Sequence, residues 1–296
     1  MTYGQTLRSI RLDKGMTQKE IYSGVVSRTF YGRFEKGEQQ MTAEKFAALL
    51  ANIGIDFNEF SYIHQNYQQP TNQSLRQQID TYYAKQDFAH LLALYNKNKA
   101  SADQQTRFLA SYAYALTYGW QNNGLQLDNA PIQPLVQYLR QLKHWTIADL
   151  EIFAMGILGM TEDWTILTAC YTEAQQTYRR YRNYSRWYDV ALPFSSILSS
   201  YTQLILDSNH HGHELANLRQ TAVEMLAEPH SAQATAIRLT LKMTIALIDM
   251  YTGDRNSATN QLKAISNTAT MLELPNAALI ATLYRYRAAQ SQLVNP

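Results

Sequence analysis

Residues 15–37 read Gly15-Met16-Thr17-Gln18-Lys19-Glu20-Ile21-Tyr22-Ser23-Gly24-Val25-Val26-Ser27-Arg28-Thr29-Phe30-Tyr31-Gly32-Arg33-Phe34-Glu35-Lys36-Gly37. Within this segment, Thr17 and Glu20 form a capping-box pattern, which predicts that a helix begins directly after Thr17. Ser27 predicts the cap of a further helix, and Gly37 predicts its end. Gly24 supplies a turn residue between the two helices. Two short helices joined by a glycine-containing turn form a helix-turn-helix.

Further helices flank this segment on both sides. Upstream, apolar side chains recur at helical spacing until Gly15 ends the pattern. Downstream, one helix is predicted from Thr42 and another near Asn58. The sequence therefore predicts a unit of five short helices over residues 1–64. Its apolar positions are Leu7, Ile10, Leu12, Phe46, Leu49, Leu50, Ile53, Phe57, Phe60 and Ile63.

Two short runs in this unit carry a family resemblance. Residues 15–21 and the run Phe34-Glu35-Lys36-Gly37 resemble the phage-repressor-like XRE helix-turn-helix. The more particular run 25–37 resembles the Rgg/GadR/MutR regulators of Gram-positive bacteria, and residues 145–153 are loosely similar to them. The resemblance implies an XRE-type DNA-binding domain joined to a long tetratricopeptide-like domain. The length of the chain agrees with that organisation.

The third predicted helix carries side chains that suit a DNA groove. In helix-turn-helix domains the N-terminal residues of this helix face the base edges. Arginine forks onto guanine and threonine meets thymine, so Arg28, Thr29 and Arg33 are the predicted base contacts, which the resemblance also supports. Tyr31 and Phe34 are predicted to face the core. The full set of predicted DNA contacts is Arg11, Gln18, Ser27, Arg28, Thr29, Arg33 and Lys36.

Phosphate contacts are assigned within that set by position. Gln18 stands at the start of the second helix, where exposed N–H groups and the helix dipole favour a phosphate. Arg11 and Lys36 are further phosphate candidates. For each basic side chain the alternative is an ordinary solvated surface charge.

Charge is unevenly distributed along this unit. Residues 1–37 carry seven basic and three acidic side chains, a balance of +4, whereas residues 38–64 carry one basic and four acidic side chains, a balance of −3. A basic end and an acidic end suit an anionic partner on one side and a protein surface on the other. Chance is the alternative explanation.

The composition of the whole chain indicates an all-α protein. The chain has 296 residues, of which 46% are hydrophobic and 17% charged, which excludes wholesale disorder. Seven Pro and 12 Gly are too few for the many turns of an all-β chain. Cys170, the single cysteine, cannot form an intrachain disulfide or a cysteine-based zinc site. The first residues lack a secretory pattern and no apolar run is long enough to span a membrane, so a cytoplasmic protein is expected.

A linker is predicted at residues 65–74. Apolar periodicity is lost there, and Pro70 discourages a helix through it. Ser74 and Gln77 form a capping-box pattern that predicts the start of a helix. The predicted domains are therefore residues 1–64 and residues 75–296.

The second domain is predicted to be an α-solenoid of about ten helices. Helical segments alternate with short polar breaks, as in stacked helical hairpins. Residues 246–254, followed by Ala258 and Leu262, resemble the turn inside a tetratricopeptide repeat.

An arginine ridge is the predicted ligand contact in this domain. If residues 178–188 are helical, Arg179, Arg182 and Arg186 share one face and could pair with carboxylates. A solvated ridge is the alternative. The resemblance implies that the concave face of the solenoid receives a short signalling peptide. The family commonly holds such peptides with Asn, which residues 153–159 and 194–201 lack.

These features predict a transcriptional regulator and no enzyme. No catalytic or phosphate-binding motif is found, and no cofactor or metal is expected. The predicted partners are double-stranded promoter DNA, a short signalling peptide in a quorum-sensing role, and a second copy of the chain. Two alternatives remain open, a ligand-independent helix-turn-helix repressor and a helical-repeat scaffold that binds a partner protein. The C-terminal apolar face at Leu279, Ile280, Leu283 and Tyr284 is the candidate dimer contact.

Overall fold

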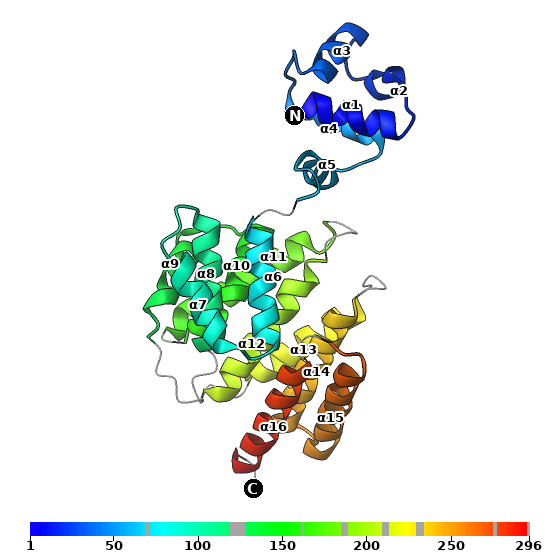
Figure 1. Cartoon of the computed structure of the whole chain (residues 1–296). Helices are drawn as coiled ribbons and strands as arrows, with labels where there is room; N and C mark the ends of the chain where they lie inside the picture. Colours follow the sequence, from blue (N-terminus) through cyan, green and yellow to red (C-terminus); the bar gives the residue numbers. More distant parts are fainter. Residues whose placement is uncertain are drawn as a thin grey trace. The chain divides into compact units, whose positions relative to one another are not determined.

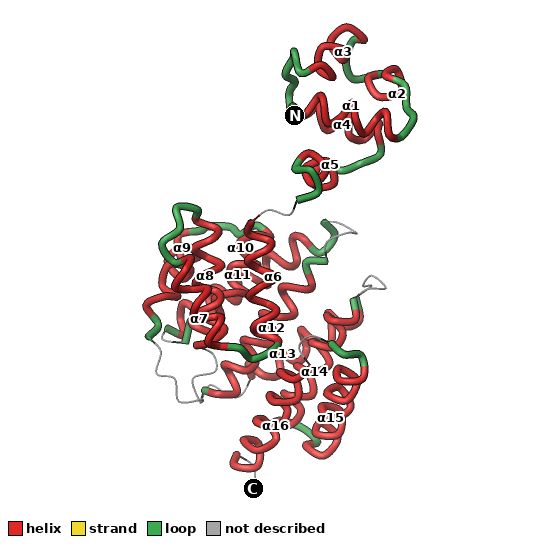
Figure 2. The backbone as a smooth tube through the Cα atoms, viewed as in Figure 1, coloured by secondary structure: helices red, strands yellow, loops and turns green. Residues whose placement is uncertain are grey.

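The computed structural model describes residues 1–68, 71–118, 128–161, 163–184, 189–208, 213–228, 234–274 and 277–294. Every regular element within these ranges is helical, as Figure 2 shows, which confirms the all-α prediction. The chain folds as two compact units, Met1–Ser74 and Leu75–Pro296. In the described part of the chain, no helix is both long and apolar enough to cross a bilayer.

The first unit begins with five short helices whose limits follow the capping signals (Figure 1). Thr17 forms the predicted capping box with Glu20, and the Ser27 hydroxyl accepts from the Phe30 N–H. Gly37 ends the third helix with φ at 80°, in the left-handed region that favours glycine. The helices are α1 (Tyr3–Asp13), α2 (Gln18–Tyr22), α3 (Arg28–Lys36), α4 (Ala43–Ile53) and α5 (Phe57–His64).

The apolar faces of these helices form one core. Leu7, Ile21, Leu49 and Phe60 are fully buried at its centre. The backbones of α1 and α3 cross closely at Gly4, where an added Cβ would stand 1.7 Å from the Phe34 carbonyl oxygen. Only glycine fits this crossing, so α3 is held firmly on α1.

The second unit is built from helix pairs in two layers. Helices α8, α10, α12, α14 and α16 contact one another in that order, and α7, α9, α11, α13 and α15 pack against them. Stacked pairs of this kind are the predicted α-solenoid. The elements are α6 (Thr71–Ala84), α7 (Phe88–Asn98), α8 (Gln104–Tyr118), η2 (Ala130–Ile132), α9 (Gln133–Gln141), α10 (Ile147–Gly156), η3 (Ile157–Gly159), α11 (Trp164–Tyr181), α12 (Ala191–Asp207), α13 (His213–Ala227), α14 (Thr235–Thr252), α15 (Arg255–Met271) and α16 (Ala277–Val294).

The tetratricopeptide-like turn lies between α14 and α15. Asp254 caps α15, its carboxylate accepting from the Ser257 N–H at 3.1 Å. Ala258 and Leu262 are both buried one and two turns later, where α15 packs against α14. Figure 1 shows α14, α15 and α16 side by side.

The start of α6 differs from the sequence prediction. The helix begins at Thr71, so the last part of the predicted linker at residues 65–74 is helical and Ser74 lies inside the helix rather than at its cap. A proline immediately before a helix does not interrupt it, because only residues within the helix need the missing N–H. Pro70 itself lies outside the described residues.

The last helix is fastened to α12 by a buried cation. Arg287 is 2% exposed, and its Nη1 and Nη2 donate to the Asp207 carboxylate at 2.6 and 2.8 Å. Ile280 is buried and Leu283 packs against the main core, so these two members of the candidate dimer contact are used inside the unit. Ile280 is therefore not part of a free apolar face, whereas Leu283 is half-buried and its role in a dimer contact stays a prediction. The side chains of Leu279 and Tyr284 lie outside the described residues.

Candidate nucleic-acid interface

Helix α3 presents a polar face to solvent and an apolar face to the core. Arg28, Thr29 and Arg33 are exposed, whereas Tyr31 and Phe34 are buried. This division confirms the predicted orientation of the helix, because residues one helical turn apart share a face. The structure thus brings the three predicted base contacts together on one exposed surface.

Ser27 has a backbone role at the start of that surface. Its hydroxyl accepts a hydrogen bond from the Phe30 N–H at 3.3 Å and so sets where α3 begins. The side chain is exposed beside Arg28. Lys36, at the other end of α3, is also exposed.

The buried side chain of Glu35 in α3 links this helix to α1 and α2. Its carboxylate is 2% exposed and accepts from Arg11 Nε at 2.5 Å and from Arg11 Nη2 at 3.0 Å. Gln18 Nε2 donates to the same carboxylate at 2.7 Å. Helices α1, α2 and α3 are therefore joined through one buried charge.

These contacts also shift the pKa values of Glu35 and Tyr31. Burial by itself would raise the pKa of Glu35, but the hydrogen bonds from Arg11 and Gln18 and the positive charge of Arg11 outweigh it, so the pKa is lowered. Burial, and then the charge of Glu35, raise the pKa of Tyr31. Glu35 is therefore a carboxylate at neutral pH and keeps its cation.

The structure corrects the prediction that Arg11 contacts phosphate. Arg11 is 7% exposed, and besides Glu35 it donates through Nη1 to the Met16 carbonyl oxygen at 2.8 Å. A buried guanidinium with these partners stabilises the first unit and does not face a DNA phosphate. Gln18 is half-buried and partly engaged by Glu35, so a phosphate contact from its remaining amide atoms stays a prediction.

Lys45 is a cation near α3 that the sequence analysis missed. Its Nζ lies over the Phe30 ring, 5.7 Å from the ring centroid. Lys45 is the one basic residue of the acidic run 38–64, and only the packing of α4 brings it to α3. No signal in the linear sequence indicates this contact.

The predicted arginine ridge does not form one helical face. Helix α11 ends at Tyr181, whose carbonyl oxygen accepts from the Tyr184 N–H at 2.8 Å, and Arg182 is the residue after the helix. Arg182 lies 3.7 Å from a carboxylate oxygen of Glu228, and Arg179 is exposed. Arg186 lies outside the described residues. Peptide contacts by Arg179 and Arg182 stay a prediction.

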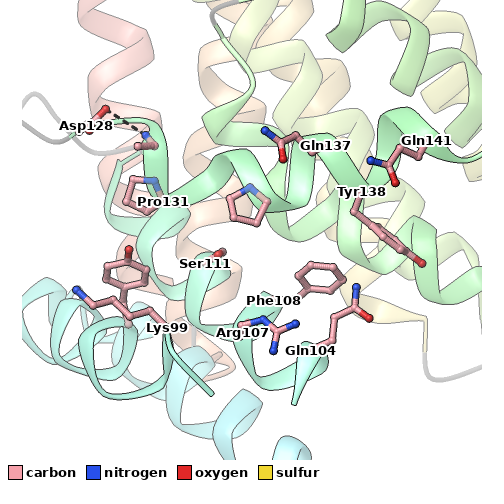
Figure 3. A pocket seen from close by; sticks show the side chains of 13 residues that line it. Lys99, Gln104, Arg107, Phe108, Ser111, Asp128, Pro131, Gln137, Tyr138 and Gln141 are labelled. Atoms are coloured by element: carbon pink, nitrogen blue, oxygen red, sulfur yellow. Dashed lines mark hydrogen bonds between the residues drawn. The ribbon is translucent and has the colours of Figure 1, made fainter. Parts of the chain in front are cut away.

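A cavity of about 580 Å³ lies elsewhere in the second unit. Helix α8 forms one wall, α7 another, and the segment η2–α9 a third (Figure 3). Neither Arg179 nor Arg182 lines it. The lining residues are Tyr95, Lys99, Gln104, Arg107, Phe108, Ser111, Asp128, Ala130, Pro131, Pro134, Gln137, Tyr138 and Gln141.

Solved structures of bacterial regulators share this architecture, although no family model matches the chain. A protein of Listeria monocytogenes EGD-e, described as a candidate transcriptional regulator, is 21% identical with a TM-score of 0.75 over 98% of both chains. The SHP pheromone receptor Rgg2 of Streptococcus dysgalactiae is 15% identical with a TM-score of 0.65, over 98% of this chain and 99% of its own.

PrgX, solved in complex with cCF10, is 13% identical with a TM-score of 0.62 over 99% of both chains. Identities this low carry the fold and nothing finer. The similarity extends over nearly the full length of each chain and agrees with the elements found above. The chain therefore has the fold of the Rgg and PrgX regulators.

Proposed function

We propose that this protein is a transcriptional regulator that reads promoter DNA with α3. The observation that carries the proposal is the exposed face of Arg28, Thr29 and Arg33 on a helix braced from behind by Glu35. Arg28 stands at the start of α3, and exposed arginine side chains on such a helix suit guanine edges in the major groove. The unit offers DNA-binding chemistry, and we assign the protein no enzymatic activity.

We further propose that a short signalling peptide bound by the second unit controls DNA binding. The support is that the similar fold occurs in Rgg2, described as a pheromone receptor, and in PrgX, solved with cCF10. A helical repeat also presents the long surface that an extended peptide needs. The protein would act in the cytoplasm, where imported peptide and promoter DNA meet.

One helix-turn-helix covers one half-site, so we propose a homodimer with two copies of α3 about one DNA turn apart. We also propose residues 1–64 as the DNA-binding domain and residues 75–296 as the regulatory domain. The change of compact unit between Ser74 and Leu75 supports this division.

The test uses a duplex that the full-length protein selects from a random pool. Arg28→Ala and Arg33→Ala should each lower the affinity for that duplex by about 5- to 150-fold, since each removes a bidentate base contact of about 1–3 kcal/mol. Affinity for an unrelated duplex should fall much less. Fluorescence anisotropy at a stated salt concentration measures both, and light scattering of the complex should give two chains per duplex.

Lys263→Ala is the matched control, because it removes one exposed positive charge from α15 in the second unit. It should bind the selected duplex as the unmodified protein does. If both α3 variants keep the original ratio of specific to nonspecific affinity, α3 is not the reading helix.

A further inference from the structure

We propose that the cavity between α7, α8 and α9 binds a short peptide through its free carboxylate. This would be a ligand site separate from the surface of Arg179 and Arg182. Only the expected effect of this site on DNA binding rests on the proposed function. The chemistry of the ligand is argued from the residues that line the cavity.

The size and the apolar surfaces of the cavity suit a compact ligand. A volume of about 580 Å³ falls within the range of small-ligand sites, roughly 300–1,000 Å³. Phe108 and Tyr138 pack together with ring centroids 5.1 Å apart, and the Tyr138 hydroxyl is held by Asp149 at 2.7 Å. Pro131 and Pro134 complete the apolar lining. These groups form a rigid surface against which a side chain can pack.

Three glutamine amides give the cavity its hydrogen-bonding character. Gln104 comes from α8, and Gln137 and Gln141 are one turn apart on α9. Figure 3 shows Gln137 and Gln141 on one side of the open space and Gln104 across it. In the described part of the chain, none of the three amides has a hydrogen-bond partner. Each can donate and accept at once, as a peptide group also does, so main-chain amides of a ligand match them.

Two cations line the same cavity. Arg107 donates through Nη1 to the carbonyl oxygens of Ser101 and Ala102, at 2.7 and 2.9 Å, which fixes the guanidinium at the start of α8. Its Nε and Nη2 have no partner among the described residues. Lys99 Nζ donates to Asn96 at 3.0 Å and lies over the Tyr95 ring, which leaves further N–H groups for a ligand.

Asp128, the one carboxylate among the lining residues, serves the backbone. Its Oδ1 accepts from the Ala130 N–H at 3.1 Å, which sets the start of η2. Its main-chain oxygen accepts from the Tyr114 hydroxyl. The lining therefore carries two cations against one anion that is already engaged. Such a lining favours an anionic ligand, and a peptide carboxylate with its neighbouring amides satisfies both the cations and the glutamines.

The test uses the full-length protein and the tripeptide series Ala-Xaa-Ala, with each standard amino acid in the middle. Each member is offered as the free acid and as the C-terminal amide. Thermal stabilisation ranks the series, and calorimetry gives the dissociation constant of the best member. We expect the free acid to bind at least about tenfold more tightly than its amide, because the amide loses the charge-assisted hydrogen bonds.

Lys99→Gln and Gln137→Ala should each weaken binding of the best tripeptide, the former by about tenfold. Lys97→Gln is the matched control, since Lys97 is exposed in the last turn of α7, two residues before Lys99, and does not line the cavity. Equal binding of acid and amide, or equal effects of Lys97→Gln and Lys99→Gln, would overturn the site, as would no stabilisation by any member of the series.

The consequence for DNA is measured separately, by anisotropy of the selected duplex with and without the best tripeptide. A changed affinity supports control through the cavity. A tripeptide that binds at the cavity but leaves the DNA affinity unchanged supports the site and contradicts its regulatory role. The α3 variants separate the two proposals. If they lose DNA binding but still bind the tripeptide normally, the cavity binds its ligand independently of DNA reading by α3.

Discussion

At the scale of single residues, Glu35 and Arg11 show how a buried charge constrains the DNA-binding unit. A carboxylate 2% exposed is tolerated because Arg11 and Gln18 satisfy both of its oxygens. Removing one partner of such a pair is far costlier than removing an exposed ion pair, since the remaining charge stays buried without its counter-charge. Arg28 and Arg33 are exposed, so neither takes part in a buried ion pair of this kind.

We predict that Arg11→Met lowers the free energy of unfolding of the first unit by about 3–5 kcal/mol at neutral pH. The loss should shrink as the pH falls, because Glu35 has a lowered pKa in the folded state. Its stabilising contribution is therefore complete above the unfolded pKa, near 4.5, and is lost as the pH falls through the folded value. Hydrogen exchange of the α1 and α3 amides over a pH series measures this.

Arg8→Met is the control, since Arg8 is exposed on the same helix. Its hydrogen exchange should match that of the unmodified protein. If Arg11→Met leaves hydrogen exchange unchanged but weakens DNA binding, Arg11 contacts DNA phosphate, and its pairing with Glu35 does not stabilise the unit.

At the scale of elements, the crossing of α1 and α3 depends on a missing side chain. An added Cβ at Gly4 meets the Phe34 carbonyl oxygen at 1.7 Å, so the two backbones would have to separate. Gly32 lies on α3 with open space around its Cβ position. The two glycines therefore differ in what an alanine would disturb.

We predict that Gly4→Ala destabilises the first unit by about 1–3 kcal/mol or more, because the clash is with backbone that cannot rotate away. Gly32→Ala should leave stability equal or raise it by up to about 1 kcal/mol through better helix propensity. It should nevertheless weaken binding of the selected duplex, since α3 then carries a methyl group on the face proposed to approach DNA. Chemical unfolding and anisotropy provide the two readouts.

The reverse pattern would contradict the assignment. Full DNA binding by Gly32→Ala, together with normal stability, would indicate that this face of α3 does not approach the duplex. Normal stability of Gly4→Ala would mean that the helices tolerate a wider crossing than the structure shows.

At the scale of the whole molecule, the second unit is closed by contacts between residues far apart in the sequence. Arg287 of α16 reaches Asp207 at the end of α12, 80 residues away. Its Nη2 also donates to the Gln203 carbonyl oxygen at 3.2 Å. A helix at the end of a repeat array has a neighbour on one side only, so such anchors decide whether it stays packed.

We predict that Asp207→Ala loosens α16, because Arg287 is then buried without a counter-charge. Hydrogen exchange in α16 should quicken by at least about tenfold, while exchange in α8 and α10 changes little. Asp254→Ala is a useful comparison, because it removes an exposed carboxylate that caps α15 and should affect α15 alone. Unchanged exchange in α16 would show that apolar packing at Ile280 is sufficient.

Much of the fold could be read from the sequence because its signals are local. Thr17, Ser27 and Gly37 mark helix ends through contacts that span three or four residues, and the structure places α2 and α3 where these residues predict. The exposed and buried faces of α3 follow from the same helical spacing. Local signals can also mislead, since the capping pattern at Ser74 is overridden by a helix that begins at Thr71.

The tertiary structure alone decided which distant groups meet. Arg11 pairs with Glu35 across 24 residues, and Lys45 crosses from an acidic run to Phe30. The cavity likewise exists only because α7, α8 and α9 are brought around one space. The linear sequence indicates that a buried carboxylate needs a cation, but only packing selects which one. Several cations, Arg28 and Arg33 among them, lie nearer to Glu35 along the chain than Arg11 does, yet Arg11 is the cation that forms the hydrogen bond.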